Sequence, residues 1–260
     1  MTAFLELAHT QNYPDHALYI VAMPIGNAAD ITLRALYILG LVDRIAAEDT
    51  RNTGRLLARY GISKPLFSIH KYNERGAGLR LIEYLRSGER IAYVSDAGTP
   101  GISDPGAQLI NLVRISGYEA IPIPGPSAVT TALSVVGTWV GTSFTFIGFL
   151  PSKSGKRISI LVALKTHPYT LVFYEAPHRI VKTINSLADT LGETRRLLIA
   201  RELTKLHEQC FHGTLIEGIT WLESDKNRQR GEFVFVVEGA NIHKNRNTHK
   251  LYKNFNSELP

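Results

Sequence analysis

Four short polar clusters carry the side chains that could perform acid–base chemistry. They comprise Glu48–Asn52, His70–Arg75, Tyr174–Arg179 and Arg201–Lys205. Each cluster contains charged side chains and follows a segment with the composition of a strand. A solvated rim would explain any one of them. Four together, with acids, bases and histidines, favour a lined cleft.

The most informative loop is Ser95–Gly106, with the sequence SDAGTPGISDPG. It lies between a predicted strand and a predicted helix, at the sheet edge where α/β proteins bind ligands. Its glycines let the backbone approach a ligand closely, and Asp96 and Asp104 place negative charge beside it. The loop suits a small polar ligand, in particular a cationic one. The alternative is a tight structural turn in which Asp104 caps the next helix.

Two further loops follow predicted strands. Pro24–Asn27 contains one glycine, so the G-x-G-x-x-G dinucleotide pattern is absent, and no phosphate-binding G-x-x-x-x-G-K-[ST] loop occurs either. Pro124–Ala128 precedes an apolar helix with small residues at its start, which suits the approach of a flat ring to the backbone. A domain linker with a helix cap explains that loop equally well.

Other reaction chemistries find little support in the sequence. His207–His212 has one residue too many for the zinc motif H-E-x-x-H, and on a strand its two histidines would point to opposite faces. No G-x-S-x-G element occurs. The single cysteine, Cys210, excludes a disulfide framework and any multi-cysteine metal site. We expect no metal site, and we expect Cys210 to be a core side chain rather than a nucleophile.

Alternating strands and helices must position these loops. Five strands are predicted in the first half, at 18–22, 44–48, 66–69, 90–95 and 119–123. The helices between them are predicted at 32–39, 53–60, 79–86 and 107–115. Such alternation predicts a parallel sheet with helices on its faces.

A second domain is predicted after the proline-rich segment Pro122–Pro126. Its predicted strands are 143–149, 170–175, 196–201, 208–217 and 232–238, and its helices are 156–164, 179–191 and 217–223. Little helix separates the last strands, so we expect a mixed sheet. The expected organisation is an N-terminal extension (1–15), an N-terminal α/β domain (16–125), a C-terminal α/β domain (126–240) and a disordered basic tail (241–260).

Composition and charge limit the class of protein. The 260 residues are 44% hydrophobic and 20% charged, which excludes extended disorder over most of the chain. The net charge of +6 suits a polyanionic partner such as nucleic acid, although a solvated basic surface would explain it as well. No apolar run approaches the length of a membrane span, and the first fifteen residues lack a basic region. We expect a soluble cytoplasmic protein without a secretion signal.

Eight stretches spread over residues 18–239 together match one family pattern. They are 18–32 (LYIVAMPIGNAADIT), 46–53 (AAEDTRNT), 70–74, 95–106, 122–128 (PIPGPSA), 173–179 (FYEAPHR), 200–205 (ARELTK) and 231–239. On these residues the chain resembles the tetrapyrrole methylase superfamily of S-adenosylmethionine-dependent enzymes. Within it, the chain resembles the branch that methylates the ribose 2′-oxygen of a cytidine in 16S rRNA of the small ribosomal subunit.

The resemblance implies a fold, a cofactor and partners. Two α/β domains would hold S-adenosylmethionine in a cleft between them, and the enzyme would act as a homodimer on 16S rRNA, with neither a membrane nor DNA as a partner. Ile25 and Gly26 would flank the cofactor. Asp96, Gly98 and Thr99 would hold its methionine part, and Ser127 and Ala128 would meet its nucleoside. Further contacts would come from Tyr174, Ala200 and Phe233.

The base that removes the ribose proton stays open at this point. Candidates are the polar residues at strand ends, namely Glu48, His70, Glu74, Glu175 and His178. Cations from the same clusters are expected to hold RNA phosphates, and these are Arg51, Arg179, Arg201 and Lys205.

Two other functions remain in competition. One is methylation of a tetrapyrrole carbon in the corrinoid pathway, which the basic charge disfavours. The other is a catalytically silent RNA-binding module that keeps the cofactor fold. Family members also commonly continue past the segment that matches Glu258-Leu259-Pro260, where this sequence stops. RNA contacts made by such a continuation are therefore in doubt.

Overall fold

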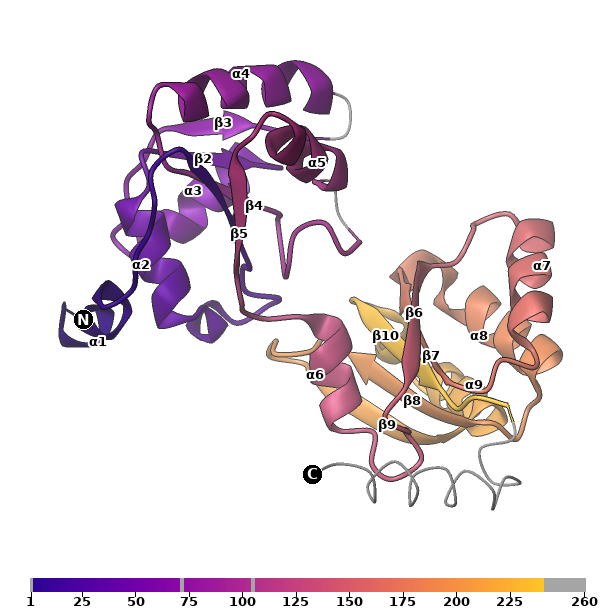
Figure 1. Ribbon diagram of the computed structural model, residues 1–260. Helices are drawn as coiled ribbons and strands as arrows, with labels where there is room; N and C mark the ends of the chain where they lie inside the picture. Colours follow the sequence, from indigo (N-terminus) through magenta and orange to yellow (C-terminus); the bar gives the residue numbers. More distant parts are fainter. Residues whose placement is uncertain (1, 71–72, 104–105, 241–260) are drawn as a thin grey trace, which may run out of the picture. The chain divides into compact units, whose positions relative to one another are not determined.

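The chain divides into two compact units, Met1–Ala128 and Val129–Pro260. A computed structural model describes residues 2–70, 73–103 and 106–240 (Figure 1), and the side chains from Glu6 on. The predicted basic tail 241–260 and Asp104 lie outside the described residues. Within this described part, no helix combines the length and the apolar character that crossing a bilayer would need.

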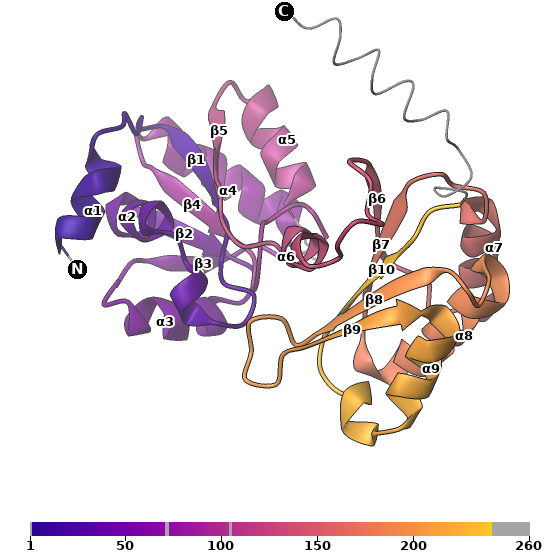
Figure 2. The same cartoon turned by 90° about the horizontal axis from the view of Figure 1, so that it is seen from below.

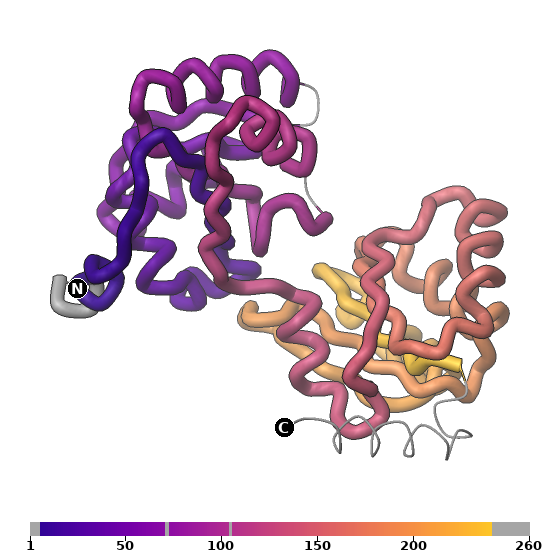
Figure 3. Tube along the Cα trace, in the orientation of Figure 1, coloured from indigo at the N-terminus to yellow at the C-terminus, as the bar shows by residue number. Residues whose placement is uncertain are grey.

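The first unit is built on a five-stranded sheet of order β3-β2-β4-β1-β5. Its strands are β1 (Ala17–Val21), β2 (Arg44–Ala47), β3 (Leu66–Ser68), β4 (Ile91–Val94) and β5 (Glu119–Ile123). All neighbouring strands are parallel. β1 and β5 are far apart in sequence yet run side by side (Figure 3). The predicted parallel sheet is confirmed.

Helices cover both faces of this sheet. They are α1 (Thr2–His9), α2 (Leu33–Leu41), α3 (Thr50–Arg59), α4 (Glu74–Arg86) and α5 (Ala107–Ile115), with a 3-10 turn η1 (Ala28–Asp30). Along β1, Tyr19 packs in one core with residues of α2 and α3. Its neighbour Leu18 packs in another core with residues of α4 and α5. The central strands are therefore buried on both faces, as continuous apolar runs in a parallel sheet indicate.

Local sequence signals explain where α2 and α3 begin. The Thr32 side chain caps α2 by accepting a hydrogen bond from the Ala35 amide at 3.1 Å. Asp49 caps α3 in the same way. α4 begins at Glu74, five residues before the predicted start at position 79. The prediction began too late because two glycines in the first turns weaken the helical pattern of the sequence. One of them, Gly78, has a packing reason: a Cβ there would lie 2.8 Å from Leu112 of α5.

The second unit contains a five-stranded sheet of order β6-β7-β10-β8-β9. Its strands are β6 (Phe144–Phe149), β7 (Thr170–Glu175), β8 (Arg196–Arg201), β9 (Gln209–Thr214) and β10 (Phe233–Val237). β6 and β7 are parallel, and the other pairs are antiparallel. The predicted mixed sheet is confirmed, and Figure 2 shows the β8–β9 hairpin with its connecting loop.

Three helices of the second unit pack against one face of this sheet. The helices and turns are α6 (Ala128–Ser134), α7 (Ser154–Leu164), η2 (Pro177–Arg179), α8 (Ile180–Leu191), α9 (Leu215–Glu223) and η3 (Lys226–Gln229). Leu161 of α7, Ile184 of α8 and Leu222 of α9 share a core with Phe173 and Phe235 of the central strands. Alternation along the strands sends the next residues to the opposite face.

Cys210 corrects one sequence-based expectation. It is exposed rather than part of the core. Its strand, β9, is the outermost of the sheet and, among the described strands, pairs only with β8, so much of β9 faces solvent. A short run with apolar residues does not reveal which strand of a sheet lies at the edge.

Candidate functional site

The carboxyl ends of β1 and β4 form the topological switch point of the first unit. These strands are neighbours in the sheet. The chain leaves β1 towards α2 on one face, whereas it leaves β4 towards α5 on the other face. Loops that diverge in this way open a crevice at the sheet edge, where α/β folds bind ligands.

Gly98 joins the two loops that diverge at this point. Its amide donates to the Met23 carbonyl, and the Met23 amide donates to the Gly98 carbonyl, both at 2.9 Å. Gly98 has φ +69°, a conformation that favours glycine. A Cβ on Gly98 would lie 3.5 Å from Cγ2 of Ile25 and 3.8 Å from the Pro126 carbonyl oxygen. Gly98 therefore lies where the loops after β1, β4 and β5 meet.

The loop after β5 is tied to the same point. The Thr99 hydroxyl donates to the Pro126 carbonyl at 3.2 Å. A Cβ on Gly125 would lie only 2.9 Å from the Cβ of Ala22, so this approach of β5 to the end of β1 requires glycine. Ser127 and Ala128 follow directly and are half-buried. The structure thus brings together the predicted cofactor residues of the first unit.

Backbone groups make up most of the region where the three loops meet, and the Asp96 carboxylate lies at its edge. Ser95 is buried and its hydroxyl donates to the Ala97 carbonyl at 3.1 Å. Asp96 and Gly26 are exposed, while Ile25 is half-buried. A backbone cradle beside a solvent-facing carboxylate suits a polar ligand that carries positive charge. The alternative helix cap by Asp104 falls outside the described residues, and Gly106 occupies the N-cap position of α5.

Glu48 and His70 lie farther along the same sheet edge. Glu48 follows β2, and its carbonyl accepts from the Ser68 hydroxyl at 3.3 Å. His70 lies two residues after the end of β3, and its amide donates to the Asn73 side chain at 2.8 Å. Both residues are half-buried. They are the two candidate bases that share the sheet edge with the Gly98 loop.

Glu74 contacts the backbone of α5. Its Oε1 accepts from the Leu109 amide at 3.0 Å. Leu109 lies in the first turn of α5, whose N-cap Gly106 offers no side-chain hydrogen bond. Glu74 supplies the missing acceptor from another helix, and its charge stabilises the positive end of α5.

Glu175 is enclosed by hydrogen-bond donors and is 2% exposed. Its Oε1 accepts from the Arg179 Nε at 2.8 Å and from the Ala176 amide at 2.7 Å. Its Oε2 accepts from the Thr183 hydroxyl at 2.5 Å. Through these contacts the Glu175 carboxylate stabilises the connection between β7 and α8. His178, in the same connection, is exposed.

The four cations expected to meet RNA differ in how they are engaged. Arg201 is 7% exposed and donates to the carbonyls of Arg230 and His207. Lys205 bridges Glu202 at 3.1 Å and Glu232 at 2.9 Å, and Arg179 pairs with buried Glu175. The Arg51 side chain is 83% exposed, although it also contacts Asp49.

Hydrogen bonds from Arg51 lower the pKa of Asp49, with the side chain contributing more than the backbone amide. Asp49 therefore remains an ionised cap of α3 around neutral pH. Its neighbour Glu48 is the other acid of this cluster.

Two of the three predicted cofactor residues in the second unit share a sheet face. Tyr174 and Ala200 both pair with Val234 of β10, so these three residues lie side by side. Phe233 is 2% exposed and packs in the core with the helices, on the opposite face. The register also places Val234 between these two residues, and the sequence alone does not indicate this position.

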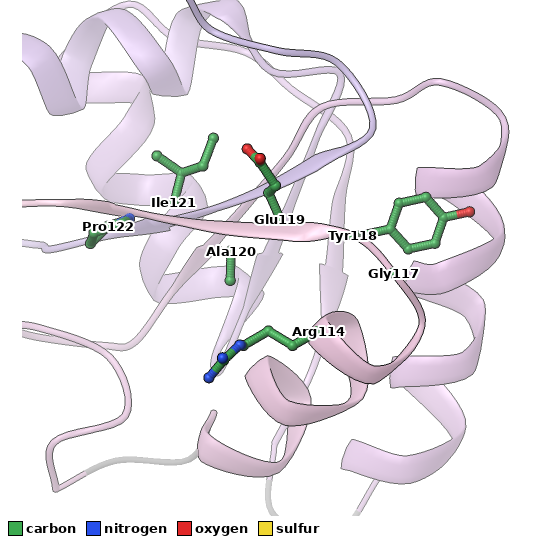
Figure 4. Close-up of a pocket in the computed structure, with 7 residues that line it drawn as sticks. All are labelled: Arg114, Gly117, Tyr118, Glu119, Ala120, Ile121 and Pro122. Atoms are coloured by element: carbon green, nitrogen blue, oxygen red, sulfur yellow. The ribbon is translucent and has the colours of Figure 1, made fainter.

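A pocket of about 470 Å³ lies along the outer strand β5 (Figure 4). Arg114 of α5 extends below the strand there, and the other lining residues run from Gly117 to Pro122. None of them is a predicted site residue. Among the described residues, no group of three or more His, Cys, Asp or Glu side chains is placed to hold a metal ion.

Comparison with known sequences identifies the family of the chain. The pattern of the family "Tetrapyrrole (Corrin/Porphyrin) Methylases" matches residues 17–217. The ribosomal RNA small subunit methyltransferase I of Escherichia coli O157:H7 is 47% identical over 222 residues, which cover 85% of this chain and 77% of that protein. The protein of the same name from Xylella fastidiosa is 49% identical over 223 residues, covering 86% and 81%.

Solved structures show the same fold. A cobalt precorrin-4 methyltransferase of cobalamin biosynthesis matches with a TM-score of 0.65 and 15% identity, over 86% of this chain and 95% of that one. A uroporphyrin-III C-methyltransferase from Thermus thermophilus, complexed with S-adenosylhomocysteine, matches with a TM-score of 0.61 and 17% identity, over 85% and 97%. The chain therefore belongs to the tetrapyrrole (corrin/porphyrin) methylase family, in the group of the ribosomal RNA small subunit methyltransferases I.

Proposed function

We propose that this protein transfers a methyl group from S-adenosylmethionine to the ribose 2′-hydroxyl of a cytidine in 16S rRNA. The relatives at 47–49% identity support the choice of ribosomal RNA. The structural observation that carries the proposal is the convergence of three loops at Gly98.

The residues at this convergence fit the cofactor. Gly98 lets the backbone approach a ligand because it has no side chain and adopts φ +69°. Thr99 fixes the position of the Pro126 carbonyl, next to Ser127 and Ala128. Asp96 supplies a negative charge for a cationic sulfonium and amino group. Tyr174, Ala200 and Phe233 belong to the other unit, and their part in cofactor binding stays a prediction.

The chemistry divides between cofactor and protein. Bound S-adenosylmethionine supplies an electrophilic methyl group, which reacts without a metal or a covalent enzyme intermediate. The protein must orient the ribose oxygen and accept its proton. Glu48 and His70 are our candidates for the base, since they end strands of the same sheet. Glu74 and Glu175 stay candidates as well, and their oxygens accept hydrogen bonds from the protein.

Binding of the RNA is proposed to be largely ionic. Among the four predicted RNA contacts, the Arg51 side chain is mostly exposed to solvent. The other three, Arg179, Arg201 and Lys205, donate hydrogen bonds to acceptors within the protein. Release of counterions would make the affinity fall steeply with salt. A flat salt response would contradict an ionic interface. The homodimer is part of the same proposal.

One assay tests the proposed function. The protein is incubated with methyl-labelled S-adenosylmethionine and small ribosomal subunits that lack the modification, and in parallel with a tetrapyrrole. Label at a cytidine ribose is the expected result. Label on the tetrapyrrole would favour the corrinoid alternative. Cofactor binding in calorimetry without transfer to either acceptor would indicate a catalytically silent RNA-binding module.

A further inference from the structure

Phe149 is an exposed aromatic ring at the carboxyl end of β6. It is 54% exposed, yet its position is fixed by other rings. It makes an edge contact with Tyr174 at 5.6 Å between centroids, and Tyr174 contacts Phe146 at 4.9 Å. Phe173 faces the helices, so Tyr174 and both phenylalanines lie on the other face of the sheet.

A β-bulge turns Phe149 to that face. Residues three apart on a regular strand, such as Phe146 and Phe149, would point to opposite faces. Here the register shifts after Phe146, so that Gly148 pairs with Phe173 and Phe149 pairs with Tyr174. Gly148 has φ +74°, which only glycine adopts readily. Bulges of this kind re-aim side chains next to functional sites.

Two guanidinium groups hold the backbone that follows Phe149. Arg179, paired with Glu175, donates from Nη1 to the Leu150 carbonyl at 3.1 Å. Arg157 is 5% exposed and donates from Nη1 to the Ser152 carbonyl at 3.2 Å and to the Pro151 carbonyl at 3.4 Å. The backbone next to the exposed ring is therefore held by side-chain hydrogen bonds, as a preorganised binding site requires.

The surroundings of Phe149 are cationic. Residues 149–187 contain six Lys and Arg and a single acid, Glu175, which is buried. Lys153, Lys156 and Lys182 are exposed. They lie at or next to the first turns of α7 and α8, the helices that follow β6 and β7. In strand–helix units these turns lie at the same sheet edge as the strand carboxyl ends.

We propose that Phe149 is a stacking platform for an unpaired base of the RNA substrate, with Lys153 and Lys156 contacting neighbouring phosphates. Single-stranded RNA is recognised by aromatic rings on which bases stack and by cations that follow the backbone. Phe149 provides the aromatic face, and the exposed lysines nearby provide the cations. This inference rests on the proposed function, because it states how that RNA is held.

The test compares three variants in steady-state methyl transfer to small ribosomal subunits. F149A is expected to raise KM for the subunits roughly 5- to 100-fold, the usual worth of one stacked base. F149W keeps an aromatic face and should stay near wild type. F144A is the matched control, since Phe144 is 45% exposed on the same strand but at its other end; its KM should not change. Calorimetry with S-adenosylhomocysteine should give the same affinity for all variants.

The outcomes separate this inference from the proposed function. A wild-type KM for F149A overturns the stacking role. A loss of S-adenosylhomocysteine affinity in F149A also overturns it, because the ring would then serve the cofactor. If wild-type protein binds S-adenosylhomocysteine but does not methylate subunits, the proposed function fails. Filter binding of a single-stranded RNA oligonucleotide to F149A and wild type then still decides whether Phe149 contacts RNA.

Discussion

Met23 and Gly98 exchange two backbone hydrogen bonds of 2.9 Å, one in each direction. This antiparallel bridge lies outside the parallel sheet and joins the loops that leave neighbouring strands β1 and β4. Beyond it, the two loops continue to helices on opposite faces of the sheet. The bridge therefore fixes the geometry of the crevice in which we place the cofactor.

Replacing Gly98 tests that geometry. In G98A, an alanine at φ +69° would be strained, which should lower the unfolding free energy by about 1 kcal/mol. Its methyl group would fill the space beside Ile25 and Pro126. We expect affinity for S-adenosylhomocysteine to fall at least about 10-fold in calorimetry. G61A is the matched control, since Gly61 has φ +73° and no atom within 4 Å of an added Cβ. It should lose similar stability but keep the affinity, and equal affinities in the two variants would remove Gly98 from the site.

Glu175 gives a prediction that separates a structural acid from a catalytic base. E175Q leaves the Arg179 guanidinium without its buried counter-charge. We expect unfolding free energy to fall by about 3 kcal/mol and the melting temperature by roughly 10 °C. T183V, which removes one donor to the same carboxylate, should cost about 1 kcal/mol. A variant E175Q that melts like wild type yet transfers no methyl group would instead establish the base role.

Much of the architecture was predictable because local patterns carry it. The parallel and mixed sheets follow from apolar runs and their spacing, and the crevice follows from the glycines and prolines at positions 95–106. The bulge at Gly148 was not predictable, because it depends on how β6 meets β7. The exposure of Phe149 results from that register and not from local composition.

The candidate catalytic residues show more clearly what the sequence alone does not predict. Glu74 and Glu48 have the same residue type and both follow strands, so sequence alone cannot distinguish them. Packing of α4 against α5 brings Glu74 to the Leu109 amide, 35 residues away, and the sequence does not reveal this contact. Arg201 likewise finds acceptors on Arg230 and His207. Such partners are set by tertiary contacts, which polar residues at strand ends do not reveal.

The Lys205 ion pairs predict a dependence of stability on pH. Burial alone would raise the pKa of Glu202, but hydrogen bonds from Glu232 and Lys205 lower it below its ordinary value of 4.5. Burial alone would lower the pKa of Lys205, but hydrogen bonds with Glu232 and Glu202 raise it above 10.5. The acid stabilises the fold above its ordinary pKa and loses this effect as pH falls. The lysine stabilises below its ordinary pKa and loses this effect as pH rises.

K205M should therefore lower the unfolding free energy by about 1 kcal/mol near pH 7. Its difference from wild type should shrink below about pH 4 and above about pH 11. Urea unfolding at a series of pH values measures this difference. K226M, at an exposed lysine of η3, provides the control and should show no such pH window. A constant difference across the whole range would contradict the ion-pair assignment.

Arg51 provides the test of the ionic RNA interface. Its side chain is 83% exposed at the start of α3, directly after the strand end that carries Glu48. If its guanidinium neutralises an RNA phosphate, R51M should weaken RNA binding and reduce the slope of log affinity against log salt by about 1. R59M changes an exposed arginine at the other end of the same helix and should leave the slope unchanged. Because Arg51 also contacts Asp49, melting temperatures of both variants must be compared. An unchanged slope in a stable R51M protein would place the phosphate contacts elsewhere, on cations such as Lys153 and Lys156.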